Sequence, residues 1–216
     1  MTLFLKSNTP IDPSAVVAKY SAVPPNAVID LNYTDNSFYY DGAYYASVAE
    51  IIAAGFGAVS GGVQTLMLPT LGSAFSLYGS GICGASTGYM FTLEDDSDGD
   101  PADNFVACSQ NGVIAASFIS YSGSASQVNF TAGAGSADAD DPISYAARLK
   151  LNDVAVSFNK TVVQSDADAV MPVGLTTLVI GNRGDGARTW AGTIGRITII
   201  NADLTDAQLV ALPDAA

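Results

Sequence analysis

From Val28 onward, apolar residues recur mostly at every second position of the chain. The segments that follow this rule are 89–93, 127–131, 145–151 and 154–158. A period of two places one side of each strand against a core and leaves the other side to solvent. Residues typical of turns, such as Gly, Asn, Asp and Ser, separate these segments. In the third segment, the residues predicted to face the core are Tyr145, Ala147, Leu149 and Leu151.

Many short strands at this spacing, with little helical pattern, predict an all-β fold built as an antiparallel sandwich. The segment Ile194–Ile200 does not alternate cleanly, because Ile197, Ile199 and Ile200 cannot all share one face. A β-bulge, or burial on both sides of the strand, would explain this pattern.

Two short helices are expected outside the strands. The first covers Ser47–Ala54 and starts with Ser47 three residues before Glu50, which is a capping-box pattern. The second covers Leu204–Leu212, where Thr205 and Gln208 have the same spacing.

The first 26 residues are rich in proline, with Pro10, Pro13, Pro24 and Pro25. Proline restricts its own backbone and that of the preceding residue to extended conformations. The sequence therefore predicts an extended N-terminal arm over residues 1–26 and one domain over residues 27–216. We expect the arm to pack on a neighbouring subunit and not on the core of its own domain.

The composition narrows the possible functions. Hydrophobic residues make up 49% of the chain and charged residues 13%, about half the usual share, which excludes disorder as the main state. The net charge of −13 disfavours nucleic acids and anionic membranes as partners. The chain has no histidine, which removes Ser-His-Asp and Cys-His catalysis, HExxH zinc sites and imidazole acid–base chemistry. We therefore expect a protein that is not an enzyme.

The start of the chain lacks a basic region before its apolar run, so no cleaved secretion signal is expected. No apolar stretch has the length of a membrane-spanning helix. Cys83 and Cys108 are the only cysteines. Such sparse usage in a large domain indicates two buried free thiols and a reducing compartment, although one disulfide is the alternative.

The last third of the chain carries a recognisable order of motifs. Leu-Val-Ile-Gly ends at Gly181, Trp-Ala-Gly-Thr-Ile begins at Trp190, and Leu-Thr-Asp-Ala-Gln-Leu begins at Leu204. This order resembles the C-terminal half of a concanavalin A-like (laminin-G-like) jelly roll. More narrowly, it is similar to such domains in tailed-bacteriophage virion proteins, namely head decorations, head fibres and tail fibres. The resemblance implies a jelly-roll β-sandwich with a closing helix, in a structural protein located in the virion and assembled in the host cytoplasm.

One hairpin departs from the family pattern. Members usually have Asn-Gly where this chain has Asn159 and Lys160. Without the glycine, Lys160 must adopt a left-handed conformation or the turn must lengthen. The departure affects the predicted turn and leaves the predicted fold unchanged.

The densest polar cluster runs from residue 94 to residue 103. Ca²⁺ binds six to eight oxygens from flexible carboxylate loops, so this cluster is a candidate calcium site, although it fails the EF-hand pattern. The alternative is a solvated hairpin tip. A glycosidase would need such carboxylates on a strand with a buried back, but Asp95 and Ser97 intervene, so no raised carboxyl pKa is expected. The candidate calcium ligands are Glu94, Asp96, Asp98, Asp100 and Asp103.

A second concentration is aromatic. Alternation places Phe38 and Tyr40 on one side of a strand and Tyr39 on the other. One set is therefore core, and the other could contact a neighbouring subunit or stack on sugar rings; we favour core plus subunit contact. The members of this aromatic set are Tyr33, Phe38, Tyr39, Tyr40, Tyr44 and Tyr45.

Taken with the resemblance, these features predict a non-enzymatic structural protein of a bacteriophage virion, a capsid decoration or a fibre or tail component. It would form a homo-oligomer and dock on other virion proteins through the arm and one tyrosine-bearing face. The alternative is a lectin-like carbohydrate-binding module that attaches to host-surface glycans. Nucleic-acid binding and membrane insertion are not expected, and Ca²⁺ is the one candidate cofactor.

Overall fold

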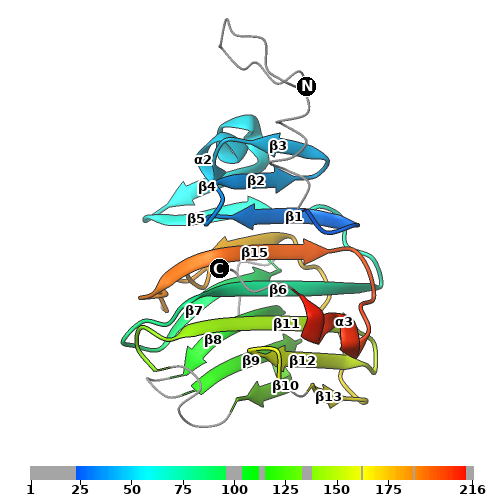
Figure 1. Ribbon diagram of the computed structural model, residues 1–216. Coiled ribbons are helices and arrows are strands. Elements are labelled where there is room, and N and C mark those ends of the chain that lie inside the picture. The colour runs from blue at the N-terminus through cyan, green and yellow to red at the C-terminus, as the bar shows by residue number, and fades with distance from the viewer. Residues whose placement is uncertain are drawn as a thin grey trace, which may run out of the picture.

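The computed structural model describes residues 23–95, 104–111, 115–132, 138–161, 163–186 and 188–212. In this part of the chain, two antiparallel β-sheets pack face to face with the hydrophobic core between them (Figure 1). The predicted fold class, an all-β sandwich of the jelly-roll type, is confirmed.

The first sheet has eight strands in the order β13-β12-β11-β6-β15-β1-β2-β3. The last strand of the chain, β15, therefore lies between two strands from the first half of the sequence, β6 and β1 (Figure 1). The strands of this sheet are β1 (Ala27–Asn32), β2 (Ser37–Tyr40), β3 (Ala43–Tyr45), β6 (Ala74–Ile82), β11 (Pro142–Lys150), β12 (Val154–Phe158), β13 (Gln164–Asp166) and β15 (Thr193–Ile200).

The second sheet has seven strands in the order β10-β9-β8-β7-β14-β5-β4. Strands β7 to β10 follow one another along the chain, whereas β14 enters from later in the sequence and pairs with both β7 and β5. The strands of this sheet are β4 (Gly57–Ser60), β5 (Val63–Met67), β7 (Gly88–Glu94), β8 (Phe105–Asn111), β9 (Ala115–Ser122), β10 (Ala125–Thr131) and β14 (Thr177–Ile180).

Alternate side chains fill the space between the sheets. On β11, Tyr145, Ala147 and Leu149 are buried in the main core, as the alternation predicts. Leu151, which was predicted to share this face, is instead 58% exposed. The strand ends at Lys150, so the alternation no longer applies one residue later, where the chain turns toward β12.

The irregular pattern of β15 has both of the expected causes. The ladder between β15 and β6 is interrupted by a bulge close to Ile194. Ile197 and Ile199 belong to the main core, whereas Ile200 is buried on the opposite side of the sheet, where it lines a small cavity with Leu212. A bulge re-aims the side chains that follow it, and β15 is buried on both sides.

The first predicted helix is present in a changed form. Ser47 caps helix α2 (Val48–Ile51), and its side chain accepts a hydrogen bond from the backbone N–H of Glu50. The chain then continues as a π-helical turn, η1 (Ile52–Phe56), in which Gly55 has a φ of +93°. A left-handed residue cannot continue a right-handed helix, so the helical segment ends at Phe56, one residue after this glycine.

The second predicted helix is confirmed as α3 (Asp206–Ala211). Its capping box is complete: Gln208 N donates to Thr205 Oγ1, and Thr205 N donates to Gln208 Oε1. The helix lies on the outer face of the eight-stranded sheet, which is the face that points away from the seven-stranded sheet (Figure 1). There Leu209 packs with Tyr78 and Ala146.

The hairpin turn that lacks the family glycine is tight. Thr161 N donates to the carbonyl of Phe158 at 2.9 Å, and Asn159 and Lys160 have positive φ values of 46° and 57°. Two successive left-handed residues form a type I′ turn. Lys160 therefore adopts the left-handed conformation that the sequence predicted as one of two outcomes.

Both cysteines are buried free thiols. Burial raises the pKa of Cys83 to about 11, with a smaller contribution from the carboxylates of Asp141 and Asp138. Burial also raises the pKa of Cys108 well above its ordinary value. A thiol that keeps its proton is a poor nucleophile, so both side chains serve as small core residues.

The predicted N-terminal arm lies mostly outside the described residues, which begin at residue 23. The arm, its contacts and the boundary after residue 26 therefore stay predictions. Within the described ranges, no helix has the length and apolar character needed to cross a membrane.

The buried ion pair between Arg196 and Asp30 gives a first testable prediction. We expect Asp30→Ala to lower the free energy of unfolding by about 3–5 kcal/mol, because it leaves the Arg196 guanidinium buried without its partner. Urea unfolding followed by circular dichroism would measure the loss.

Asp203→Ala is the matched control. The carboxylate of Asp203 is 41% exposed and pairs with the exposed Lys150. It also lies 3.8 Å from Arg148 Nε, but Arg148 keeps its shorter contacts with Asp153 and Asp206, so the removal of Asp203 should cost about 1 kcal/mol or less. Equal effects of the two substitutions would contradict the structural role given to the buried pair.

Candidate functional site

A cavity of about 580 Å³ opens on the outer face of the eight-stranded sheet. It lies where β6 ends and where β11 and β15 begin, at the end of the sheet opposite α3. We call it the outer-face cavity. Its volume is within the usual range for small-molecule sites. The polar side chains that line it are Tyr33, Thr34, Ser80, Ser144, Asn159 and Thr193.

Strand register brings these side chains together. Ser80 on β6 stands opposite Ser144 on β11, and Ile82 stands opposite Thr193 on β15. Residues two apart on a strand share a face, so both pairs belong to the outer face. Asn159 joins them from the turn after β12, because its Oδ1 accepts the backbone N–H of Ser144 at 2.7 Å.

The close approach of β6 and β15 requires a glycine at the cavity. A Cβ added to Gly81 would lie 2.1 Å from the backbone oxygen of Thr193. The bulge of β15 falls at the same place, between Ile194 and Arg196. Any larger residue at position 81 would push the two strands apart and change the shape of the cavity.

Two hydroxyl groups of the lining are buried without a hydrogen-bond partner, namely Ser80 Oγ and the phenol of Tyr33. Burial raises the pKa of Tyr33 well above its ordinary value, so the phenol keeps its proton and remains a donor. Among the described residues, the side-chain nitrogen of Asn159 also has no partner. Buried polar groups in proteins are nearly always hydrogen-bonded, so two unpaired hydroxyls beneath one cavity are unusual, whereas the exposed Asn159 amide and the hydroxyls of Ser144, Thr193 and Thr34 are the polar groups of the lining that are not fully buried.

Sequence reasoning did not single out Ser80, Ser144 or Thr193. Isolated serines and threonines on strands are common, and only the pairing register places these three around one cavity. The one local signal is the run Gly79-Ser80-Gly81, in which two residues without side chains flank a small polar one.

A buried ion pair lies beside the cavity on the same face. Arg196 donates from Nε and Nη2 to the two carboxylate oxygens of Asp30, at 2.7 and 2.8 Å. Thr198 Oγ1 also donates to Asp30 at 2.8 Å. This bidentate arrangement fixes the guanidinium between β1 and β15.

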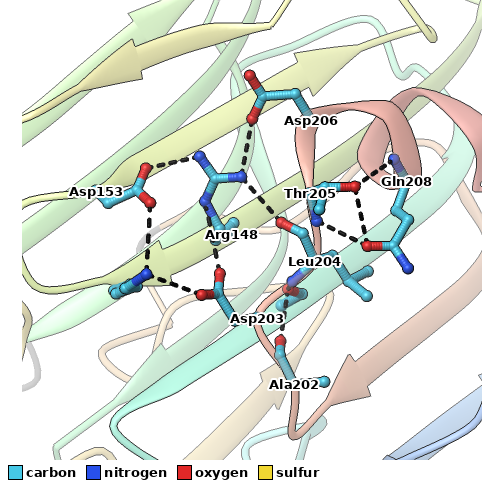
Figure 2. Close-up of polar contacts among 10 residues, drawn as sticks. Arg148, Asp153, Ala202, Asp203, Leu204, Thr205, Asp206 and Gln208 are labelled. Carbon is cyan, nitrogen blue, oxygen red and sulfur yellow. Dashed lines mark hydrogen bonds and ion pairs between the residues drawn. The ribbon is translucent and has the colours of Figure 1, made fainter.

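The opposite end of the outer face is closed by α3. Figure 2 shows the Arg148 guanidinium between the carboxylates of Asp153, Asp203 and Asp206. Its shortest contacts are 2.6 Å to Asp153 and 2.8 Å to Asp206, and it also donates to the carbonyl of Leu204 at 2.9 Å. These bonds tie the start of α3 to β11, so this cluster has a structural role.

The aromatic set divides as the alternation predicts. Phe38 and Tyr40 are buried in the main core. Tyr39 and Tyr44 stand opposite each other on β2 and β3, with ring centroids 5.2 Å apart, and are half-buried. The remaining members, Tyr33 and Tyr45, pack against the core from its edge. The proposed contact of this set with another subunit or a sugar stays a prediction.

The predicted calcium cluster is described only at its first residue. Asp96, Asp98, Asp100 and Asp103 lie outside the described residues. Glu94 is only 2% exposed, which corrects the expectation that no carboxylate here is buried. Its Oε1 accepts bonds from Thr92 Oγ1 at 2.5 Å and from Gly184 N at 2.9 Å.

Asp95 is also buried, which the sequence argument did not expect. Burial raises the pKa of Glu94 above its ordinary value, although the hydrogen bonds from Thr92 and Gly184 and the charge of Arg183 act in the opposite direction. The carboxylate of Glu94 holds the turn at Gly184 and does not line the outer-face cavity. In the described part of the chain, no group of three or more acidic or cysteine side chains is arranged to hold a metal ion.

The sandwich is similar to domains of carbohydrate-active proteins. It matches the CBM40 domain of an IT-sialidase from Ruminococcus gnavus with a TM-score of 0.51 and 10% identity, over 65% of this chain and 82% of that one. It matches domain 4 of AbnA, a GH43 extracellular arabinanase from Geobacillus stearothermophilus in complex with arabinotriose, with a TM-score of 0.50 and 14% identity, over 72% and 75%.

A third match is the NanB sialidase from Streptococcus pneumoniae, with a TM-score of 0.53 and 14% identity, over 67% of this chain but only 24% of that one. At such low identities the likeness shows the fold alone, a lectin-like β-sandwich. No protein-family model matches the chain, and no curated protein matches its sequence.

The burial of Glu94 gives a prediction about pH. Because its folded-state pKa lies above the unfolded value, the folded protein holds the proton more tightly, and stability falls as pH rises from about 4.5 through the folded pKa. Glu94→Gln keeps an acceptor for Thr92 and Gly184 but cannot ionise. The variant should therefore gain stability relative to the natural protein as pH rises, as measured by urea unfolding at several pH values.

Glu50→Gln provides the comparison, since Glu50 is an exposed glutamate at the start of α2. If the stability difference between the Glu94→Gln variant and the natural protein stays constant from about pH 4 to pH 8, the raised pKa is wrong.

Proposed function

We propose that this protein is a non-catalytic carbohydrate-binding domain whose ligand occupies the outer-face cavity. The observation that carries the proposal is the ring of uncharged hydrogen-bonding side chains around one cavity, with the Ser80 and Tyr33 hydroxyls left unpaired. Sugar hydroxyls both donate and accept, so they match hydroxyl and amide groups of the same kind. The likeness in fold to a CBM40 domain and to an arabinanase domain in complex with arabinotriose supports the proposal.

The apolar part of the lining fits the same ligand class. Ile82, Pro142 and Ile194 border the cavity, and Ile82 is 36% exposed. Sugar rings have apolar C–H faces as well as hydroxyls, and small-molecule sites combine an apolar surface with a few placed polar groups. Covering the exposed part of Ile82 would add a hydrophobic contribution to binding.

The chemistry of the cavity favours binding without catalysis. Hydrolysis of a glycosidic bond normally requires two carboxyl groups on either side of the bond. The described residues that line the outer-face cavity include no carboxylate. Glu94, the buried carboxylate with the raised pKa, is held by the Gly184 turn and is not part of that lining.

A role in a bacteriophage particle, which the sequence resemblance favours, stays a prediction, as do the homo-oligomer and the contacts with other virion proteins. Mass spectrometry and electron microscopy of the particle that encodes this chain would test them. Glycan binding is the better supported function, because the cavity and the likeness in fold both support it.

A variant that fills the cavity tests the proposed function. Ser144 is half-buried on the outer face, so Ser144→Tyr should place a ring in the cavity and leave the core intact. We expect the affinity for any glycan bound by the natural protein to fall about tenfold or more, which corresponds to about 1.4 kcal/mol. A glycan array would identify the ligand, and isothermal titration calorimetry would measure the change.

Ser165→Tyr is the matched control, because Ser165 is an exposed residue of β13 that does not line the cavity. It should bind like the natural protein. A glycan that binds both variants with unchanged affinity would place the site elsewhere.

A further inference from the structure

The lining of the outer-face cavity contains no charged side chain among the described residues. Its hydrogen-bonding groups are the hydroxyls of serine, threonine and tyrosine and the amide of Asn159. Such groups bind neutral hydroxyls well, but a carboxylate that loses its water is bound best by a charged donor, and this lining has none among the described residues.

The loop that leads into the cavity is acidic. Asp141 immediately precedes the lining residue Pro142, and the loop that contains it is bonded to the end of β6: Cys83 N donates to the carbonyl of Asp141, and Asp140 N donates to the carbonyl of Cys83. Asp138, Asp140 and Asp141 are all exposed. Among the described residues, two cations adjoin the lining in sequence: Lys160, which has an interaction partner of its own, and Arg196, which is bound by Asp30. An anionic ligand would therefore meet a field that repels it.

The nearby arginines are committed to structural ion pairs. Arg196 neighbours Ser80 on the outer face, but its guanidinium is only 8% exposed and is bound by both carboxylate oxygens of Asp30. Arg148 is held in the same way at the other end of the face by Asp153 and Asp206. If Arg196 turned to a ligand, the carboxylate of Asp30 would stay buried without its partner. If Arg148 did so, the start of α3 would lose its bonds to β11. Both changes would lower the free energy of unfolding.

We infer that the glycan bound in the outer-face cavity is uncharged, and that this domain rejects sugars that carry a carboxylate. The inference rests on the proposed function, because it names the ligand class of that same cavity. The juxtaposition that carries it is a neutral, hydroxyl-lined cavity next to an acidic loop, with the neighbouring arginine held by Asp30.

Matched sugar pairs test the inference. Lactose is neutral, and sialyllactose is lactose extended by one acidic sugar, so the two form a matched pair. Arabinotriose is a second neutral ligand with different sugar units. Nuclear magnetic resonance titration of the ¹⁵N-labelled full chain at low salt would measure binding of each. We expect neutral sugars to bind at least about tenfold more tightly than their acidic partners, with a difference that shrinks as salt is added.

Ile82→Lys sharpens the test, since it places a cation at the cavity without touching the core. It should raise the affinity for sialyllactose, whereas Ile82→Gln should not. Tighter binding of sialyllactose than of lactose by the natural protein, blocked by Ser144→Tyr, would overturn the inference and leave the proposed function standing. Absence of binding to every glycan of a broad array would overturn the proposed function, and the inference with it.

Discussion

The buried ion pair between Asp30 and Arg196 is the interaction on which the outer face of the sandwich depends. It joins two strands whose paired residues are 166 positions apart, and it places β15 between β1 and β6. A charged pair with so little exposure tolerates little misalignment, because either group alone would be buried without compensation. Once β15 is fixed there, Thr193 faces the cavity and α3 follows onto the same face.

The features that could be predicted from the sequence are those encoded within a few residues. Alternation identified the core face of β11, and the spacing of Thr205 and Gln208 identified the capped start of α3. The missing glycine after Asn159 predicted either a left-handed Lys160 or a longer turn, and the first is observed. In each case the physical cause is local, either a backbone preference or a hydrogen bond that spans three residues.

The candidate site could not be predicted because its causes are not local. Ser80 and Ser144 meet only through the register of two strands that are far apart in the sequence. Glu94 lies in an acidic run that suggested exposure, yet the backbone N–H of Gly184, 90 residues later, binds its carboxylate and turns it inward. Register is set by the packing of a whole sheet, and one residue of slip would reverse the faces.

The placement of charge links this fold to the ligand preference that we propose. The chain has 8 basic residues against 21 acidic ones, and within the described part Arg196 joins β1 to β15 while Arg148 joins α3 to β11. Each arginine that holds the outer face together is thereby withdrawn from any ligand that lies on it. Carboxylates outnumber the basic groups, so those left over face solvent, as Asp140 does near the cavity. Because these ion pairs occupy the arginines, hydroxyl and amide groups remain as the side-chain groups that can bind a ligand on this face. Such groups suit neutral sugars better than acidic ones.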